Sequence, residues 1–290
     1  MLIINVLIKN KLTYLAALST LILLLWLINK NVVAGNEQTA LSLTNFSFAS
    51  YIGTGFYTVS GQDVYVIQLP FHYTIKEKSD TETGWVLNLP LTIGIINFDN
   101  FRDLDFENLP KPDDITTLTF IPGIEYQYPV TADWTLIPFA DYGFARDLNH
   151  NANVLITACG IKSYANFHLT NGMLTLGNRF LYAREHIGGT DEDSDFSLIE
   201  TGLNYRIAAN YSFSNGPLYT NFYYINFYYP NELVFFERTN NPVHVDIENE
   251  VGFTLSNLPD FLFFEKPQIG LGIRTGDKVN VYRLLFSAPF

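Results

Sequence analysis

The sequence predicts an all-β fold, a single antiparallel transmembrane β-barrel of about 12 strands preceded by a signal peptide. The first observation is a series of long strand-like runs in which apolar and polar side chains alternate. The second is composition, since aromatic residues make up 16% of the 290 residues and charged residues only 16%, against about 25% charged in soluble domains. The third is that no apolar run after residue 34 approaches the roughly 20 residues of a spanning helix. A closed barrel is then the way to cross a bilayer with every backbone group paired.

Residues 1–34 are predicted to be a secretory signal peptide. Lys9 and Lys11 supply its basic region, residues 12–28 form its apolar run, and Ala34 lies directly before the expected cleavage point. The apolar run is long for a signal, which leaves an uncleaved anchor as the alternative. Residues 35–45 are short and polar, and we expect them to form a periplasmic or lumenal lead-in. Residues 46–290 remain for the outer-membrane β-barrel.

The predicted strands are mostly longer than the roughly 5–6 residues usual in soluble proteins. They are also long enough to cross a bilayer at a tilt, for which about 9–11 residues suffice. We predict strands at residues 46–58, 63–75, 84–98, 114–128, 134–147, 153–167, 172–185, 195–211, 217–229, 242–256, 267–274 and 278–290.

Alternation is clearest in residues 243–255. Val245, Ile247 and Phe253 belong to the apolar face of this strand, whereas Asp246 and Glu248 belong to the polar face. In a soluble sandwich the apolar face would point inward, but in a membrane barrel it points toward lipid and the polar face lines the interior. Strand length, aromatic content and the signal peptide together favour the membrane arrangement.

The connections support a barrel whose first strand rises from the periplasm, with both chain ends periplasmic. Connections predicted to be external, at residues 99–113, 186–194 and 230–241, are mostly longer than those predicted to be internal, at 129–133, 168–171 and 212–216, as outer-membrane barrels prefer. Two connections depart from this pattern, because 275–277 is short yet external and 257–266 is long yet internal.

Charges of both signs lie on the polar faces and are predicted to line the lumen. Because buried charges are normally paired, we favour a salt-bridge network that braces the wall. The alternative is a polar conduction or binding path whose charge rings set selectivity. Arg283 is expected to pair with Glu200 or with the acids of residues 242–256. The lumen-lining candidates are Glu125, Asp141, Arg179, Glu185, Glu200, Arg206, Asp246, Glu248, Glu250, Arg274 and Arg283.

The last predicted strand carries an apolar face that ends on Phe290. This run resembles the C-terminal signal that bacterial outer-membrane proteins present to the barrel assembly machinery. The face is therefore expected to point outward, toward lipid or that machinery. It consists of Tyr282, Leu284, Phe286 and Phe290.

Charge and motifs narrow the function classes. A formal charge of −12 argues against nucleic acid as a partner, and the single Cys159 excludes an intramolecular disulfide and is expected to pack as a small hydrophobe. No G-x-S-x-G elbow, Cys/His metal spacing or phosphate-binding glycine loop is present, so we assign no catalytic, cofactor-binding or metal-binding residue. An outer-membrane hydrolase, a protease or lipase with His150 and His186 in its external half, is kept as an alternative. A surface adhesin or complex partner acting through the acidic loops, such as those at 99–113 and 186–194, is another.

Residues 122–129 and 134–143, P-G-I-E-Y-Q-Y-P and W-T-L-I-P-F-A-D-Y-G, are predicted to form a barrel hairpin. This hairpin resembles those of autotransporter translocator domains, and most of all the solitary autotransporter-like barrels of Gram-negative bacteria. The resemblance implies a twelve-stranded barrel over about residues 40–290 in the cell outer membrane, with membrane lipid and the assembly machinery as partners. Since only residues 35–45 separate the signal from the barrel, we expect a non-enzymatic barrel without a passenger, a porin-like conduit or binder of small solutes.

Overall fold

The computed structural model describes residues 50–51, 53–59, 62–96, 115–148, 153–187, 193–213, 216–236, 242–259, 267–276 and 279–290. The predicted signal peptide at 1–34, the lead-in at 35–45 and the acidic loop at 99–113 lie outside these residues. Among the helices within the described ranges, none has the length and apolar character needed to cross a membrane.

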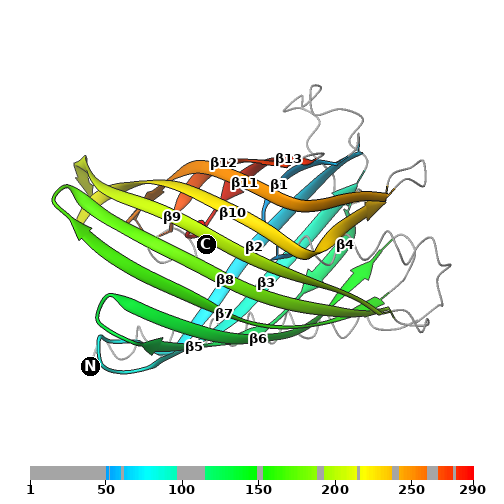
Figure 1. The fold of residues 1–290 in the computed structure, drawn as a ribbon, viewed down its shortest axis with the longest axis horizontal. Helices are drawn as coiled ribbons and strands as arrows, with labels where there is room; N and C mark the ends of the chain where they lie inside the picture. Colours follow the sequence, from blue (N-terminus) through cyan, green and yellow to red (C-terminus); the bar gives the residue numbers. More distant parts are fainter. Residues whose placement is uncertain are drawn as a thin grey trace, which may run out of the picture.

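The chain forms a closed antiparallel β-barrel, in which strands pair with their neighbours in the sequence, apart from β4 and β5, and the last strand pairs with the first (Figure 1). The strands β4 and β5 both pair with β3 and with β6, so they share one place in the wall and the barrel has 12 strand positions. This confirms the predicted all-β fold class and strand number. The strands are β1 (Gly55–Val59), β2 (Gln62–Lys76), β3 (Gly84–Ile96), β4 (Ile115–Phe120), β5 (Gly123–Pro129), β6 (Trp134–Asp147), β7 (Asn153–Leu169), β8 (Gly172–Ile187), β9 (Asp193–Phe213), β10 (Gly216–Phe236), β11 (Pro242–Ser256), β12 (Ile269–Gly276) and β13 (Val279–Leu285).

The break between β4 and β5 lies at Ile121 and Pro122, where one continuous strand was predicted. Proline has no backbone N–H to donate to the ladder, and the carbonyl of Pro122 instead accepts the N–H of Tyr142 at 2.9 Å. Gly143 of β6 permits this close approach, because a Cβ there would lie 2.2 Å from the carbonyl oxygen of Phe120.

Two predicted strands differ from the structure at the ends of the barrel domain. The first strand was predicted at 46–58, but β1 covers only Gly55–Val59, and Ser50 and Tyr51 are helical. The last was predicted at 278–290, but β13 ends at Leu285 and residues 286–290 leave the wall. We call the pairing of the first strand with the last, β1 with β13, the seam of the barrel. The seam is short, since it has five residue pairs, and β1 likewise makes only five pairs with β2.

The outer face of the barrel is apolar. Outward side chains on many strands are large, hydrophobic and exposed, among them Val251 at 56% and Leu271 at 54%. The inward positions hold both charged residues and an apolar cluster that includes Leu181, Leu198, Ile225 and Phe227. The outer face is thus apolar, as expected for the membrane arrangement, whereas the interior mixes buried charges with apolar side chains.

One outward assignment is wrong. Val245 was placed with Ile247 on the outer face, but it is 2% exposed and packs in the interior cluster, whereas Ile247 is 45% exposed. The register between β10 and β11 shifts at this point, so four residues of β10 lie opposite the single residue Asp246. The extra β10 residues form a bulge, and a bulge of this kind changes which face the following side chains occupy.

Candidate functional site: the polar interior of the barrel

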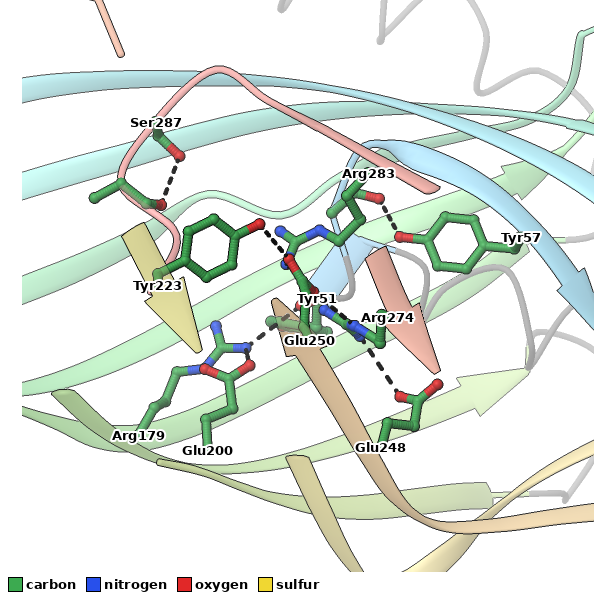
Figure 2. Close-up of polar contacts among 12 residues, drawn as sticks. Tyr51, Tyr57, Arg179, Glu200, Tyr223, Glu248, Glu250, Arg274, Arg283 and Ser287 are labelled. Carbon is green, nitrogen blue, oxygen red and sulfur yellow. Dashed lines mark hydrogen bonds and ion pairs between the residues drawn. The ribbon is translucent and has the colours of Figure 1, made fainter. Parts of the chain in front are cut away.

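The densest polar group lies inside the barrel beside the seam, and we call it the seam cluster. It consists of Tyr223, Tyr229, Glu248, Glu250, Arg274 and Arg283. These side chains come from β10, β11, β12 and β13, which are consecutive in the wall. Figure 2 shows Tyr223, Arg274 and Arg283 around Glu250, with Glu248 on the other side of Arg274.

Glu250 is the centre of the seam cluster and is 0% exposed. Its carboxylate accepts hydrogen bonds from Arg274 Nε at 2.9 Å, from Arg283 Nη1 at 2.8 and 3.0 Å, and from the hydroxyl of Tyr223 at 2.8 Å. Charge-assisted bonds of this kind offset the cost of removing a carboxylate from water. The prediction that Arg283 points inward and pairs with an acid of the 242–256 strand is confirmed.

Glu248 extends the cluster by one inward position along β11. It accepts a hydrogen bond from the hydroxyl of Tyr229 at 2.8 Å and lies 3.6 Å from Arg274 Nη1. Arg274 is 1% exposed and its guanidinium lies 3.6 Å from the centre of the Phe227 ring. One buried arginine thus contacts two carboxylates and an aromatic face.

The register of the strands explains why these residues meet. Glu250 lies directly opposite Arg274 in the β11–β12 pair, and Arg283 of β13 lies opposite Gly272. A Cβ at Gly272 would lie 2.1 Å from the Tyr223 hydroxyl and 2.7 Å from Glu250 Oε1. The glycine therefore leaves the space in which the tyrosine and the glutamate form their bond.

A second ion pair lies on the wall opposite the seam, which we call the far wall. There Arg179 of β8 faces Glu200 of β9 in register. Arg179 also donates to the backbone carbonyl of Tyr51 at 3.4 Å. Both members of the Arg179–Glu200 pair were among the predicted lumen-lining residues.

Of the two residues in a third ion pair, the sequence analysis predicted Glu125 but not Lys162. Glu125 accepts hydrogen bonds from Lys162 Nζ at 2.6 Å and from the side-chain amide of Asn88 at 2.7 Å. Lys162 was missed, although it shares the inward face of β7 with Ile156 and could have been found by extending the even-numbered face of that strand. The three groups balance in charge, since four glutamates meet four basic side chains.

The remaining predicted residues lie outside these ion pairs. Asp141 is half-buried and occupies the space that a side chain at Gly123 would need. Arg206 contacts the sulfur of Met173 at 3.7 Å and lies 5.3 Å from the ring centre of Tyr219. Glu185 is 0% exposed.

Asp246 is exposed and does not share the buried face of Glu248 and Glu250.

The aromatic face predicted at the end of the chain divides in two. Tyr282 and Leu284 are exposed on the outer face of β13, as predicted. The prediction that Phe290 also points outward is wrong, because it packs against the interior cluster. Phe286 follows the end of β13 and is half-buried. The physical reason is that residues 286–290 are not a strand, so their side chains do not continue its alternation.

The residues considered for hydrolysis or metal binding form no comparable group. His186 lies in register with Asp193 on the β8–β9 pair and is exposed, while His150 lies outside the described residues. Within the described ranges, no group of three or more His, Cys, Asp or Glu side chains could hold a metal ion. Cys159, expected to pack as a small hydrophobe, is exposed.

Apolar side chains fill the interior of the barrel, and ion pairs between strands brace its wall. Apolar side chains such as Leu181 and Ile225 are 0% exposed in the same interior that holds the ion pairs. No protein-family model matches this chain, and no curated protein matches it at a significant level. The fold and the charged interior are therefore the observations on which a function can be built.

Proposed function

We propose that this protein is an integral outer-membrane β-barrel of a Gram-negative bacterium, a non-enzymatic barrel of the translocator type. The observation that carries the proposal is the apolar outer face of the barrel. Buried ion pairs lie inside the wall, whereas large apolar side chains are exposed outside it. Soluble monomers rarely expose contiguous apolar patches larger than a few hundred Å².

The composition of the outer face fits a bilayer. It combines aliphatic residues such as Val251 and Leu271 with aromatic residues such as Phe222, Tyr224 and Phe253, each more than 40% exposed. Closure of the wall between β1 and β13 leaves no sheet edge in the hydrocarbon. Membrane lipid and the machinery that inserts barrels are the partners that this surface implies.

The filled interior favours a closed barrel over an open pore. A wide water-filled channel would expose inward side chains, yet Leu181, Ile225 and Glu250 are all 0% exposed. Four glutamates and four basic side chains of the interior are paired with one another, which supports bracing of the wall as their main role. Passage of a solute would require the interior side chains to move.

Lipid-phase labelling of single cysteines tests the membrane proposal. In a Cys159→Ala background, Val251→Cys and Phe253→Cys should react with a probe that partitions into the bilayer core, because both positions face outward. Thr254→Cys is the matched control, since it lies beside Phe253 but is 0% exposed. Equal labelling of Phe253→Cys by a water-soluble probe and by the lipid-phase probe would contradict the proposal.

Conductance across a planar bilayer tests whether the barrel is closed. We expect the inserted protein to show no steady ion current, in contrast to a water-filled porin channel. A stable ohmic current from protein that migrates as the folded form on unheated gels would favour the conduit that the resemblance suggested.

A further inference from the structure

The seam of this barrel is held by very little backbone pairing. β1 makes five residue pairs with β13, whereas β7 makes 16 with β8. A short strand that must close a sheet is the place where a barrel opens most easily, because opening it breaks few hydrogen bonds. Two short segments that flank the seam strands supply additional contacts, and both lie inside the barrel.

The first segment is residues 286–290, which follow β13. The ring of Phe290 lies against Gly177 of β8 and Gly202 of β9, which face each other in register. A Cβ would lie 2.1 Å from the ring at Gly177 and 2.7 Å from it at Gly202, so two glycines are needed to make room. We call this pair the glycine seat. Tyr164 stacks beside the same ring, with 6.1 Å between ring centres.

The glycine seat lies across the barrel from the seam. Counted around the wall, β8 is six strand positions from β1 in both directions. Phe290 therefore ties the strand that closes the barrel to the opposite wall. Phe290 is half-buried against the interior cluster, so removal of its ring would take away these contacts between the two sides of the barrel.

The second segment is residues 50–51 and 53–54, which precede β1. The carbonyl of Tyr51 accepts a hydrogen bond from Arg179 of β8 at 3.4 Å, and its ring lies 6.1 Å from that of Phe196 on β9. Gly53 then turns the chain toward β1 with φ of 95°, a value that favours glycine. Both segments that flank the seam thus reach the same two strands, β8 and β9.

We propose that these two segments form an internal latch that holds the β1–β13 seam closed, with Phe290 in the glycine seat as its main contact. Release of Phe290 frees residues 286–290, and the barrel then opens sideways between β1 and β13. The latch goes beyond the proposed membrane function, because it concerns how the wall stays closed and where it opens.

A substitution in the glycine seat gives the sharpest test, because it lies on the wall opposite the seam. Gly202→Ala adds a methyl group that displaces the Phe290 ring, and Phe290→Ala removes the ring itself. Hydrogen–deuterium exchange of the folded protein should then be about tenfold faster or more at the β1 amides. Exchange should stay unchanged in the part of the β7–β8 ladder that lies away from Tyr164 and Gly177, where residues 154–159 pair with residues 182–187. The matched control is Thr201→Ala, which alters an exposed neighbour of Gly202 on the outer face.

Two outcomes would overturn the latch. One is unchanged exchange at β1 in folded Gly202→Ala and Phe290→Ala protein. The other is an equal rise at β1 and in that part of the β7–β8 ladder, which would indicate general destabilisation. Phe290→Leu, which keeps an apolar side chain for the seat, should restore most of the protection.

A reversible crosslink keeps the test decisive if those variants fail to fold. With Cys159→Ala, the pair Gly202→Cys and Phe290→Cys places two thiols where the ring now meets the seat. The oxidised protein should exchange its β1 amides more slowly than the same protein after reduction. Equal exchange in the two forms would show that residues 286–290 do not control the seam.

Discussion

The two sides of the barrel are held together in different ways. On the far wall, β7, β8 and β9 are long strands, and β8 makes 16 residue pairs with β7 and 14 with β9. On the seam side, β12 makes six pairs with β13, and β13 makes five with β1. Yet the seam side holds the larger polar cluster, in which Glu250 contacts Arg274, Arg283 and Tyr223.

The difference shows where side chains replace backbone pairing. A long antiparallel ladder supplies on average about one hydrogen bond per residue pair and needs little help from the interior. A short ladder supplies few, and the seam cluster links β10, β11, β12 and β13 through bonds that cross from strand to strand. Ion pairs between strands contribute most where the strands share the fewest backbone hydrogen bonds.

Removing the charge at the centre of the seam cluster should have the largest effect. Glu250→Gln leaves Arg274 and Arg283 buried with one carboxylate fewer, and loss of one partner of a buried pair costs about 3–5 kcal/mol. We expect that decrease in the free energy of unfolding, measured by urea titration of the protein in detergent. Glu82→Gln is the control, because Glu82 pairs with Lys76 on the surface and should change stability little. Equal effects of the two substitutions would show that the seam cluster does not brace the wall.

A charge introduced on the outer face should lower the stability of the protein equally on the seam side and on the far wall. Leu271→Arg on β12 and Leu203→Arg on β9 both replace exposed apolar side chains. In a bilayer each should cost about 2–4 kcal/mol if it lies near the midplane. Refolding into lipid vesicles, monitored by tryptophan fluorescence, measures the cost. A negligible cost at both positions would argue that the outer face meets water.

Breaking the ion pair on the far wall should cost less than breaking the seam cluster. Glu200→Gln removes one charge-assisted partner of Arg179, which keeps its bond to the carbonyl of Tyr51. A loss of about 1–3 kcal/mol follows from leaving a buried group partly unsatisfied. The same urea titration compares this value with that of Glu250→Gln. A larger loss at Glu200 would reverse the proposed ranking of the two walls.

The sequence predicts the wall well because alternation at period two is a local property. It places Glu250 and Arg283 inside and Leu284 outside, and the structure agrees. It also separates the chain into about twelve strands, apart from the break at Pro122. Each of these features depends on neighbouring residues within one strand or on a single turn residue.

The interior contacts that cross the barrel could not be predicted in this way. Phe290 was placed outside because its strand was extended through residues 286–290, and nothing local shows that the chain turns inward there. Pro289, which cannot donate to a ladder, was the one signal against a strand. The glycine seat depends on Gly177 and Gly202 being opposite each other in register, which no single strand reveals.

The smallest predicted effect concerns the residue at which the alternation of β11 fails. The sequence placed Asp246 on one face with Glu248 and Glu250, but the bulge in β10 leaves it exposed. Asp246→Asn should therefore change the free energy of unfolding by no more than about 0.5 kcal/mol. Glu248→Gln should cost more, because Glu248 is 3% exposed and bonds to Tyr229. If Asp246→Asn destabilised the protein as much as Glu248→Gln, the side chain of Asp246 would have to lie inside, and the register shift beside Tyr228 would be wrong.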